Sequence, residues 1–141
     1  MKIIGLDYGS KRLGFAVSDP SETMALVLST VEVKGKKDAI RAVMEVCEEQ
    51  EADKLIIGLP RNMDGSIGPM AEEVKSFSIE LRGILKIPVE NYDERLTTAM
   101  VERSLIDQDV SRARRKGVRD KLAAQAILQG YLDSENGEIS C

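Results

Sequence analysis

The sequence predicts an α/β domain in which a five-stranded mixed sheet carries helices on both faces. The chain begins with three strand-like segments in a row and then alternates helical and strand-like segments. Consecutive strands favour antiparallel pairing, whereas alternating units favour parallel pairing, so the sheet should combine both. With 141 residues, the chain has the size of one domain with a substantial core. We expect a single domain over residues 1–141 that ends in a polar tail from about 134 to 141.

The first two strands are predicted to form a β-hairpin. Ile3–Leu6 is a continuous apolar run, Tyr8–Ser10 supplies a turn, and Arg12–Val17 is a second strand-like run. A continuous apolar run is typical of a strand that is buried on both faces. Asp7 follows this run where the strand leaves the core, so its carboxylate has to be solvated, paired or bound to a cation. Gly9 leaves room for a ligand or another backbone segment to approach closely.

The middle of the chain is predicted as a strand, a helix and a second strand. Ala25–Val33 is the strand, and Gly35 ends it. Asp38 is expected to cap the helix that follows. The inward positions of this helix have the i, i+3, i+4, i+7 spacing and are Ile40, Val43, Met44 and Cys47. Lys54–Leu59 is the next buried strand, and Pro60 ends it.

The remaining elements are predicted from the same kinds of pattern. They are, in chain order, a loop over Arg61–Pro69, a helix over Met70–Leu85, a strand over Lys86–Tyr92, a helix from Thr97 or Thr98 to about Ile106, an irregular basic stretch over Asp107–Val118 and a helix over Arg119–Asp133.

Composition excludes several kinds of chemistry. The chain has no His, which excludes Ser-His and Cys-His nucleophiles and His-ligated metals. Its two cysteines, Cys47 and Cys141, are far apart in sequence, so we expect neither a zinc site nor a structural disulfide. The net charge of −4 gives no overall attraction to nucleic acid or to anionic membrane. No apolar run could span a bilayer, and we expect a cytoplasmic protein without a membrane partner.

Carboxylates occur at three positions that could converge. Asp7 ends the first strand, Asp93 and Glu94 end the strand that begins near Pro88, and Asp120 lies at the start of the last predicted helix. Sites in parallel-type sheets gather at the carboxyl ends of the strands. The first two positions would therefore share one edge of the sheet if their strands run in the same direction.

Asp120 belongs to the apolar stripe of its helix. The residues at +3, +4, +7 and +11 from it are Ala123, Ala124, Ile127 and Tyr131, so Asp120 is expected on the side facing the core. The alternative is that Asp120 matches the helix dipole near an N-terminus. A dipole role would not require the core-facing side, so the face argument favours a functional role. Clustered carboxylates without His suit Mg²⁺ or Mn²⁺, which would relieve their mutual repulsion.

Basic residues are concentrated beside these carboxylates in an otherwise acidic chain. Phosphates held by Arg and Lys next to an acidic metal centre would suit a polyanionic substrate. For Arg95, an ion pair with a neighbouring carboxylate is an equally good interpretation. The predicted nucleic-acid-binding residues are Lys11, Arg12, Arg61, Arg95, Arg112, Arg114, Arg115, Lys116, Arg119 and Lys121.

Four motifs spread over almost the whole chain resemble the YqgF/RuvX family. They are Ile-Gly-Leu-Asp-Tyr-Gly at 4–9, Gly-Leu-Pro-Arg-Asn-Met-Asp-Gly-Ser at 58–66, Asp-Glu-Arg-Leu-Thr-Thr at 93–98 and Asp-Lys-Leu-Ala-Ala-Gln-Ala-Ile-Leu-Gln at 120–129. The resemblance implies an RNase H-like fold and a nuclease assigned to maturation of the 5′ end of pre-16S ribosomal RNA. The family formerly carried the name Holliday junction resolvase, by analogy with RuvC.

The resemblance also implies an acidic site formed by Asp7, Glu94 and Asp120, with Asp93 as an alternate to Glu94. Pro60 stands where some related resolvases have an acidic residue, so the site should differ from theirs in detail. Cofactors would be Mg²⁺ or Mn²⁺, and the partner a structured RNA such as pre-rRNA or a branched DNA.

Three alternatives to an RNA nuclease stay open at this point. One is a DNA endonuclease of the Holliday junction type. Another is a module that binds ribosomal RNA or the transcription machinery without cutting. The third is an ATP-binding fold, because Asp7–Ser10 also resembles the first phosphate loop of actin-like and sugar-kinase proteins, although that fold needs two such domains. The sequence leaves open whether the chain acts as a monomer or a homodimer.

Overall fold

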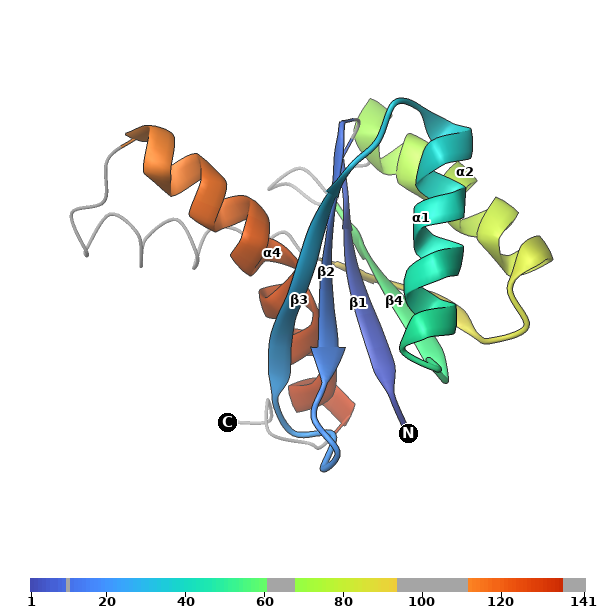
Figure 1. Ribbon diagram of the computed structural model, residues 1–141, viewed down its shortest axis with the longest axis vertical. Helices are drawn as coiled ribbons and strands as arrows, with labels where there is room; N and C mark the ends of the chain where they lie inside the picture. Colours follow the sequence, from blue (N-terminus) through green and yellow to red (C-terminus); the bar gives the residue numbers. More distant parts are fainter. Residues whose placement is uncertain (10, 61–67, 94–111, 136–141) are drawn as a thin grey trace.

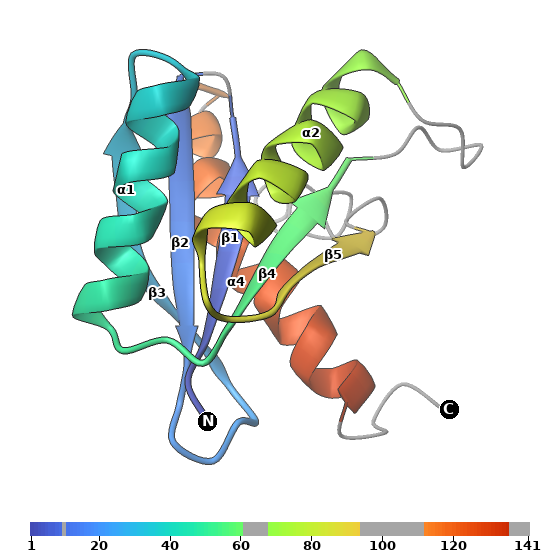
Figure 2. The same ribbon diagram turned by 90° about the vertical axis from the view of Figure 1, so that its right-hand side faces the viewer.

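The computed structural model describes residues 1–9, 11–60, 68–93 and 112–135, with side chains from 122 onward in the last range. A five-stranded sheet has the strand order β3-β2-β1-β4-β5, with β1 in the centre (Figures 1 and 2). The strands are β1 (Ile3–Tyr8), β2 (Arg12–Ser18), β3 (Ala25–Glu32), β4 (Lys54–Leu59) and β5 (Val89–Asp93). The helices are α1 (Lys36–Glu49), α2 (Pro69–Ile84) and α4 (Arg112–Glu135).

The sheet is mixed, as the sequence predicts. β1 pairs antiparallel with β2, and β2 pairs antiparallel with β3. β1 and β4 are parallel, and so are β4 and β5. The strand order and directions confirm the predicted fold class of three antiparallel strands followed by parallel ones.

Two helices cover one face of the sheet and one helix covers the other. Figure 1 shows α1 and α2 on one side of the strands and α4 on the opposite side, and Figure 2 places α1 and α2 in front. The core between the sheet and α1 and α2 includes Phe15 and Phe77, both fully buried. The core under α4 combines small residues, among them Ala16 and Ala124, with larger ones such as Leu128 and Tyr131.

Alternate residues of β1 serve these two cores. Ile4, Leu6 and Tyr8 belong to the core under α1 and α2, whereas Ile3 belongs to the core under α4. At Gly5, an added Cβ would lie 2.7 Å from Cβ of Leu128. No residue with a side chain could stand there without displacing α4, so the glycine allows the helix to approach the central strand.

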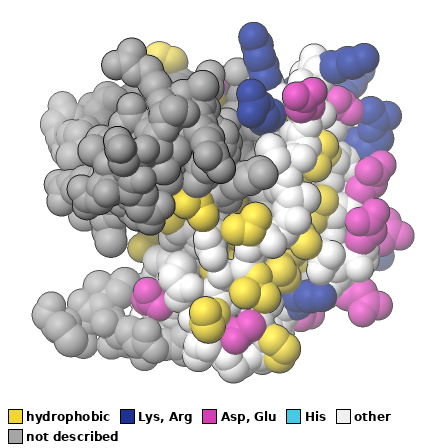
Figure 3. All heavy atoms as spheres, turned by 60° about the vertical axis from the view of Figure 1, so that its left-hand side comes forward, with side chains coloured by type: hydrophobic (Ala, Val, Ile, Leu, Met, Phe, Trp, Pro, Cys, Tyr) yellow, Lys and Arg dark blue, Asp and Glu magenta, His cyan; other side chains and the backbone are white. Residues whose placement is uncertain are grey.

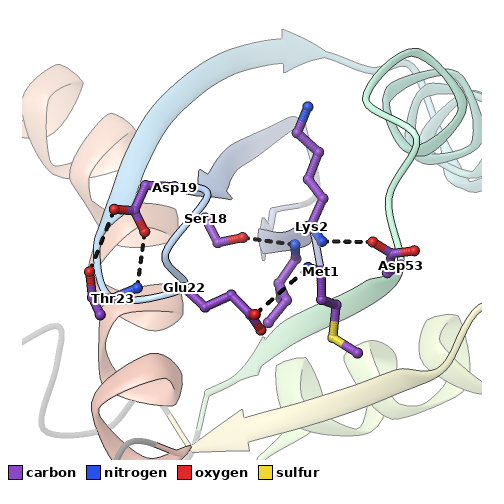
Figure 4. Close-up of polar contacts among 8 residues, drawn as sticks. Met1, Lys2, Ser18, Asp19, Glu22, Thr23 and Asp53 are labelled. Atoms are coloured by element: carbon purple, nitrogen blue, oxygen red, sulfur yellow. Dashed lines mark hydrogen bonds and ion pairs between the residues drawn. The ribbon is translucent and has the colours of Figure 1, made fainter.

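The chain is tied together at the end of the sheet where β1 begins (Figure 4). The amide of Ile3 donates to Oγ of Ser18 over 2.9 Å, and the amide of Lys2 donates to the Asp53 carboxylate over 2.7 Å. Asp19 accepts from the amides of Thr23 and Met24 in the loop between β2 and β3. These backbone donors lower the pKa of Asp19, with the Met24 amide contributing most.

Two local predictions about α1 are wrong. Asp38 is not the N-cap, because the helix begins at Lys36 after Gly35. The Asp38 carboxylate instead reaches back to accept from the amide of Lys34 over 2.9 Å. Met44 is 41% exposed rather than inward, while its neighbour Val43 is fully buried. The buried stripe of the helix is Ala39, Val43 and Cys47, and Met44 lies outside it although its spacing fits the pattern.

The last helix begins earlier than predicted. α4 starts at Arg112, so 112–118 are helical rather than irregular. Its first turn contains no acidic residue. The predicted helix over 97–106 lies outside the described residues. Among the helices that are described, none is long and apolar enough to cross a membrane.

Candidate active site

Asp7 occupies the carboxyl end of the central strand. It lies opposite Gly14 of β2 and is partly buried. Because side chains alternate along a strand, Asp7 shares the face of Ile3 and Gly5, which is the face under α4. The sequence prediction that this carboxylate stands where a buried strand leaves the core is confirmed.

β5 ends at the same edge of the sheet. Asp93 is its last residue and is aligned with Leu59, the last residue of the parallel strand β4. Asn91 belongs to the α2 side, because its amide nitrogen donates to Oγ of Ser78 over 2.9 Å. Alternation therefore gives Asp93 the same side as Asn91.

The even-numbered residues of β5 belong to the α4 side. Glu90 forms an ion pair with Lys54, whose Nζ also donates to the Tyr131 hydroxyl of α4 over 2.7 Å. Tyr92 lies against α4, since an added Cβ at Gly130 would be 2.7 Å from its hydroxyl oxygen. Glu94, which the family resemblance implies as a site residue, lies outside the described residues.

On β4, the strand between β1 and β5, a glycine lies between Asp7 and Tyr92. Gly58 of β4 is aligned with Tyr92. The parallel register pairs Leu6 with Ile57, so its continuation by one residue brings Asp7 beside Gly58. Since glycine has no side chain, β4 places no group over the α4 face between the two.

α4 runs antiparallel to β1 across this face. Near its end, Tyr131 contacts Lys54, which pairs with Ile3 at the start of β1. Earlier in the helix, the carbonyl oxygen of Ala124 lies 3.2 Å from the Cβ that Gly5 would carry. Successively earlier residues of α4 thus meet successively later residues of β1.

Asp120 lies in α4, four residues before Ala124, and its side chain is outside the described residues. It is eight residues after Arg112, more than two turns of about 3.6 residues each into the helix. A role in matching the N-terminal dipole falls off within the first turn. The early start of the helix therefore removes the alternative explanation for this carboxylate.

Among the residues whose side chains are described, no three acidic or Cys side chains are grouped so as to hold a metal. Two of the three predicted ligands, Glu94 and Asp120, have side chains outside that set. The structure thus places Asp7 and Asp93 at one edge of the sheet, on opposite faces by alternation.

Tyr8 is a residue of this region that the sequence analysis assigned to a turn. It is the last residue of β1, and its ring centroid lies 4.5 Å from that of Phe77. Its hydroxyl donates to Glu73 over 3.0 Å. Burial, with a further contribution from Glu73, raises the pKa of Tyr8 to about 12. Its even spacing from Ile4 and Leu6 was the signal that could have identified it as a strand residue.

Two of the predicted basic residues, Lys11 and Arg12, are described and lie at the same end of the sheet as Asp7. Lys11 and Arg12 are exposed and follow the β1–β2 turn, which the amide of Gly9 closes by donating to the Arg12 carbonyl over 2.9 Å. The close approach expected at Gly9 is thus made by the chain itself. Figure 3 shows Lys and Arg side chains gathered at the upper end of one face.

The other predicted basic residues are placed less fully. Arg61 and Arg95 lie outside the described residues. The remaining ones lie on the first three turns of α4 and are described by their backbone alone: Arg112, Arg114, Arg115, Lys116, Arg119 and Lys121.

Solved structures resemble the fold at low sequence identity. T. thermophilus RuvC in complex with Holliday junction substrate matches with a TM-score of 0.61 and 17% identity, over 97% of this chain and 96% of that one. The ROK hexokinase from Thermus thermophilus matches with a TM-score of 0.50 and 22% identity, over 74% of this chain but 38% of the kinase. At such identities both likenesses describe the fold, which is RNase H-like.

Sequence comparison finds relatives of much higher identity than these solved structures. A protein from Caldanaerobacter subterraneus subsp. tengcongensis, named "Putative pre-16S rRNA nuclease", is 48% identical over 136 residues, covering 96% of this chain and 98% of that protein. The family model described as RuvX, Holliday junction resolvase, matches residues 1–134. Relatedness over nearly the full length of both sequences means that this chain belongs to the RuvX family.

Proposed function

We propose that this protein is a metal-dependent phosphodiester hydrolase that processes the 5′ end of pre-16S ribosomal RNA. The observation that carries the proposal is the position of Asp7, a carboxylate at the end of the central strand on the face crossed by α4. The name of the relative from Caldanaerobacter supports the choice of RNA substrate.

The path of α4 supports convergence of Asp120 with Asp7. The helical turn from Ala124 to Leu128 lies at the level of Gly5, and Asp7 is two strand residues, about 6.6 Å, further along β1. One helical turn back from Ala124 covers about 5.4 Å in the same direction, because the helix is antiparallel to the strand. The preceding turn, residues 120 to 124, is therefore expected near the level of Asp7, and Asp120 is its first residue.

Alternation along β5 supports Glu94 rather than Asp93 as the third carboxylate. Glu90 and Tyr92 belong to the α4 side of the sheet, which is the side of Asp7. Asp93 shares the side of Asn91, which is opposite to that of Asp7, so Glu94 is the better candidate of the two.

The donor set fits a hard divalent cation. Carboxylates without His or thiolate partners are the ligands that Mg²⁺ and Mn²⁺ prefer. Asp7, Glu94 and Asp120 would hold the ion, which when bound would activate a water and stabilise the leaving oxygen of a phosphodiester. Lys11 and Arg12, at the same end of the sheet, would hold substrate phosphates.

A DNA junction is the second candidate substrate, favoured by the description of the family model. A binding module without catalysis would use the same basic residues. The kinase likeness supports the fold alone, and the chain spans 38% of that kinase, so nucleotide enclosure between two domains has no support here.

The test compares D7N, E94Q and D120N with wild type on a pre-16S RNA fragment and on a four-way DNA junction, each with Mg²⁺ or Mn²⁺. We expect each change to lower the cleavage rate by on the order of 10³-fold, because a metal ligand that acts in the transition state is lost. Glu135→Gln, an exposed residue at the end of α4 away from Asp120, is the control and should cut normally. Unchanged cleavage in all three site variants would refute the hydrolase.

A further inference from the structure

A hollow lies at the same end of the sheet as Asp7, between the start of β2, the end of β3 and the start of α1. It is lined by Lys11, Arg12, Glu32, Val33, Lys34 and Asp38. α1 follows β3, which runs in the direction of β1, so the helix begins at the edge of the sheet where Asp7 lies (Figure 1).

Backbone contacts fix the segments that line this hollow. The amide of Val33 donates to the carbonyl of Lys11 over 2.9 Å. Arg12 is paired with Glu32 in the β2–β3 register. The amide of Lys34 donates to the Asp38 carboxylate over 2.9 Å. The exposed cations Lys11, Arg12 and Lys34 therefore extend from a backbone that is held in place, which reduces the entropy lost when they bind a ligand.

Asp38, one of the two acids in the hollow, is engaged by neighbouring donors. The Lys34 amide and the Arg41 guanidinium both bond to Asp38, and they lower its pKa. Glu32 lies opposite Arg12. With Arg41 and Lys37 included, cations outnumber carboxylates around the start of α1, in a chain whose net charge is −4.

Apart from Asp38 in its first turn, the charges at the two ends of α1 run against its own helix dipole. Lys36 and Lys37 are its first residues, whereas Glu48 and Glu49 are its last, and its last turn contains no basic residue. A helix dipole favours the reverse arrangement by about 0.3–1 kcal/mol per charge. Lys36 is explained by an ion pair with Glu80 of α2 at 3.1 Å. The stability of α1 does not explain Lys37, so a requirement outside the helix is indicated.

We propose that Lys11, Arg12, Lys34 and Lys37, here called the α1 flank, bind the phosphate backbone of a nucleic-acid arm that extends from the active site. The proposal rests on the proposed function and adds Lys34 and Lys37 to the residues that hold substrate. Glu45, Glu48 and Glu49 at the other end of α1 repel the same backbone, so the helix directs the arm along its basic end. In Figure 3, Asp and Glu side chains follow one edge of the face below the basic residues.

The test measures binding rather than cleavage. Lys34→Glu with Lys37→Glu is compared with wild type for affinity to a labelled RNA duplex and a labelled DNA duplex over a range of salt concentrations. Binding should weaken about 10- to 100-fold at low salt, and the slope of log affinity against log salt should fall by about 2. The control is Lys86→Glu, an exposed lysine between α2 and β5 at the opposite end of the sheet, which should bind like wild type.

Measuring the free energy of unfolding distinguishes a binding role of Lys37 from a structural role. Lys37→Glu places a negative charge at the start of α1, so its free energy of unfolding should equal or exceed that of wild type while its affinity falls. Equal affinities for the flank double variant and Lys86→Glu, with wild type binding and cutting normally, would overturn the α1 flank alone. A wild type that neither binds nor cuts would overturn the proposed function as well. Loss with RNA but not DNA would assign the arm to RNA.

Discussion

The two faces of the sheet use alternate residues of the same strands but differ in what they carry at the end of β1. On the face under α1 and α2, the strand ends with Tyr8, which is buried and packs on Phe77. On the face under α4, the corresponding position is Asp7, a partly buried carboxylate preceded by Gly5. An aromatic pair closes one face, whereas a charge occupies the same level of the other.

Neighbouring residues of β1 therefore have different roles: Tyr8 contributes to stability, and Asp7 is the candidate for chemistry. Large side chains fill the α1 and α2 face, so its contribution is packing. The α4 face contains small residues, which allow the helix to lie close to the strand. The geometry of this contact decides where the polar groups of the helix lie relative to β1. Substitutions on the two faces should therefore fail in different ways.

The largest effect on stability is expected from Phe77→Ala. Phe77 is fully buried between α2 and the sheet, so its truncation should cost about 3–5 kcal/mol of unfolding free energy. Cleavage per folded molecule should change little, because the α4 face is untouched. Urea denaturation and a cleavage assay on the same sample measure both quantities. Ile79→Ala, 64% exposed on the same helix, should change stability by about 0.5 kcal/mol or less.

Gly5→Val should give the opposite pattern. Its Cβ would meet Leu128 Cβ at 2.7 Å, so α4 has to shift away from β1, at a cost of about 1–3 kcal/mol. Because the helix also carries Asp120, cleavage per folded molecule should fall much more than it does in Phe77→Ala. Gly83→Ala, where an added Cβ meets nothing within 4 Å, should instead gain about 0.5–1 kcal/mol. A Gly5→Val protein that cuts at the wild-type rate would contradict the assignment of the site to this face.

Tyr8→Phe should have the smallest effect. Loss of the hydrogen bond to Glu73 should cost about 0.5–1.5 kcal/mol near neutral pH. The pKa of Tyr8 is raised to about 12 in the folded protein, so its contribution is complete below about pH 10 and is lost as the pH rises towards 12. Unfolding free energies of wild type and Tyr8→Phe should therefore approach each other over that range. A constant difference from neutral to high pH would show that the pKa of Tyr8 is the same in the folded and the unfolded protein.

The strands could be predicted from sequence because their apolar runs are continuous and short, as at Ile3–Leu6 and Lys54–Leu59. The start of α4 could not, because Arg112–Val118 has no apolar stripe and contains Gly117. Helical periodicity becomes visible only where the helix meets the sheet, beyond Asp120. A helical segment without an apolar stripe gives no periodic signal in the sequence.

The candidate site, too, could be predicted from the sequence only in part. Asp7 follows directly from the end of a buried run. The choice between Asp93 and Glu94 needed the register of β5 and the faces of Asn91 and Tyr92, which depend on contacts with α2 and α4. The turn assignment of Tyr8 failed because its partners Phe77 and Glu73 are distant in the chain.

α4 is translated last among the described elements but packs against strands that are translated first. Gln125 and Gln129 of α4 bond to Ala25, about a hundred residues earlier in the chain. On the ribosome, the elements from β1 to β5 emerge before this helix, so the face under α1 and α2 can pack first. The other face waits for the last described element to be translated. A nascent chain would thus carry Asp7 without its opposing helix, and hydrolysis would begin only after α4 has docked.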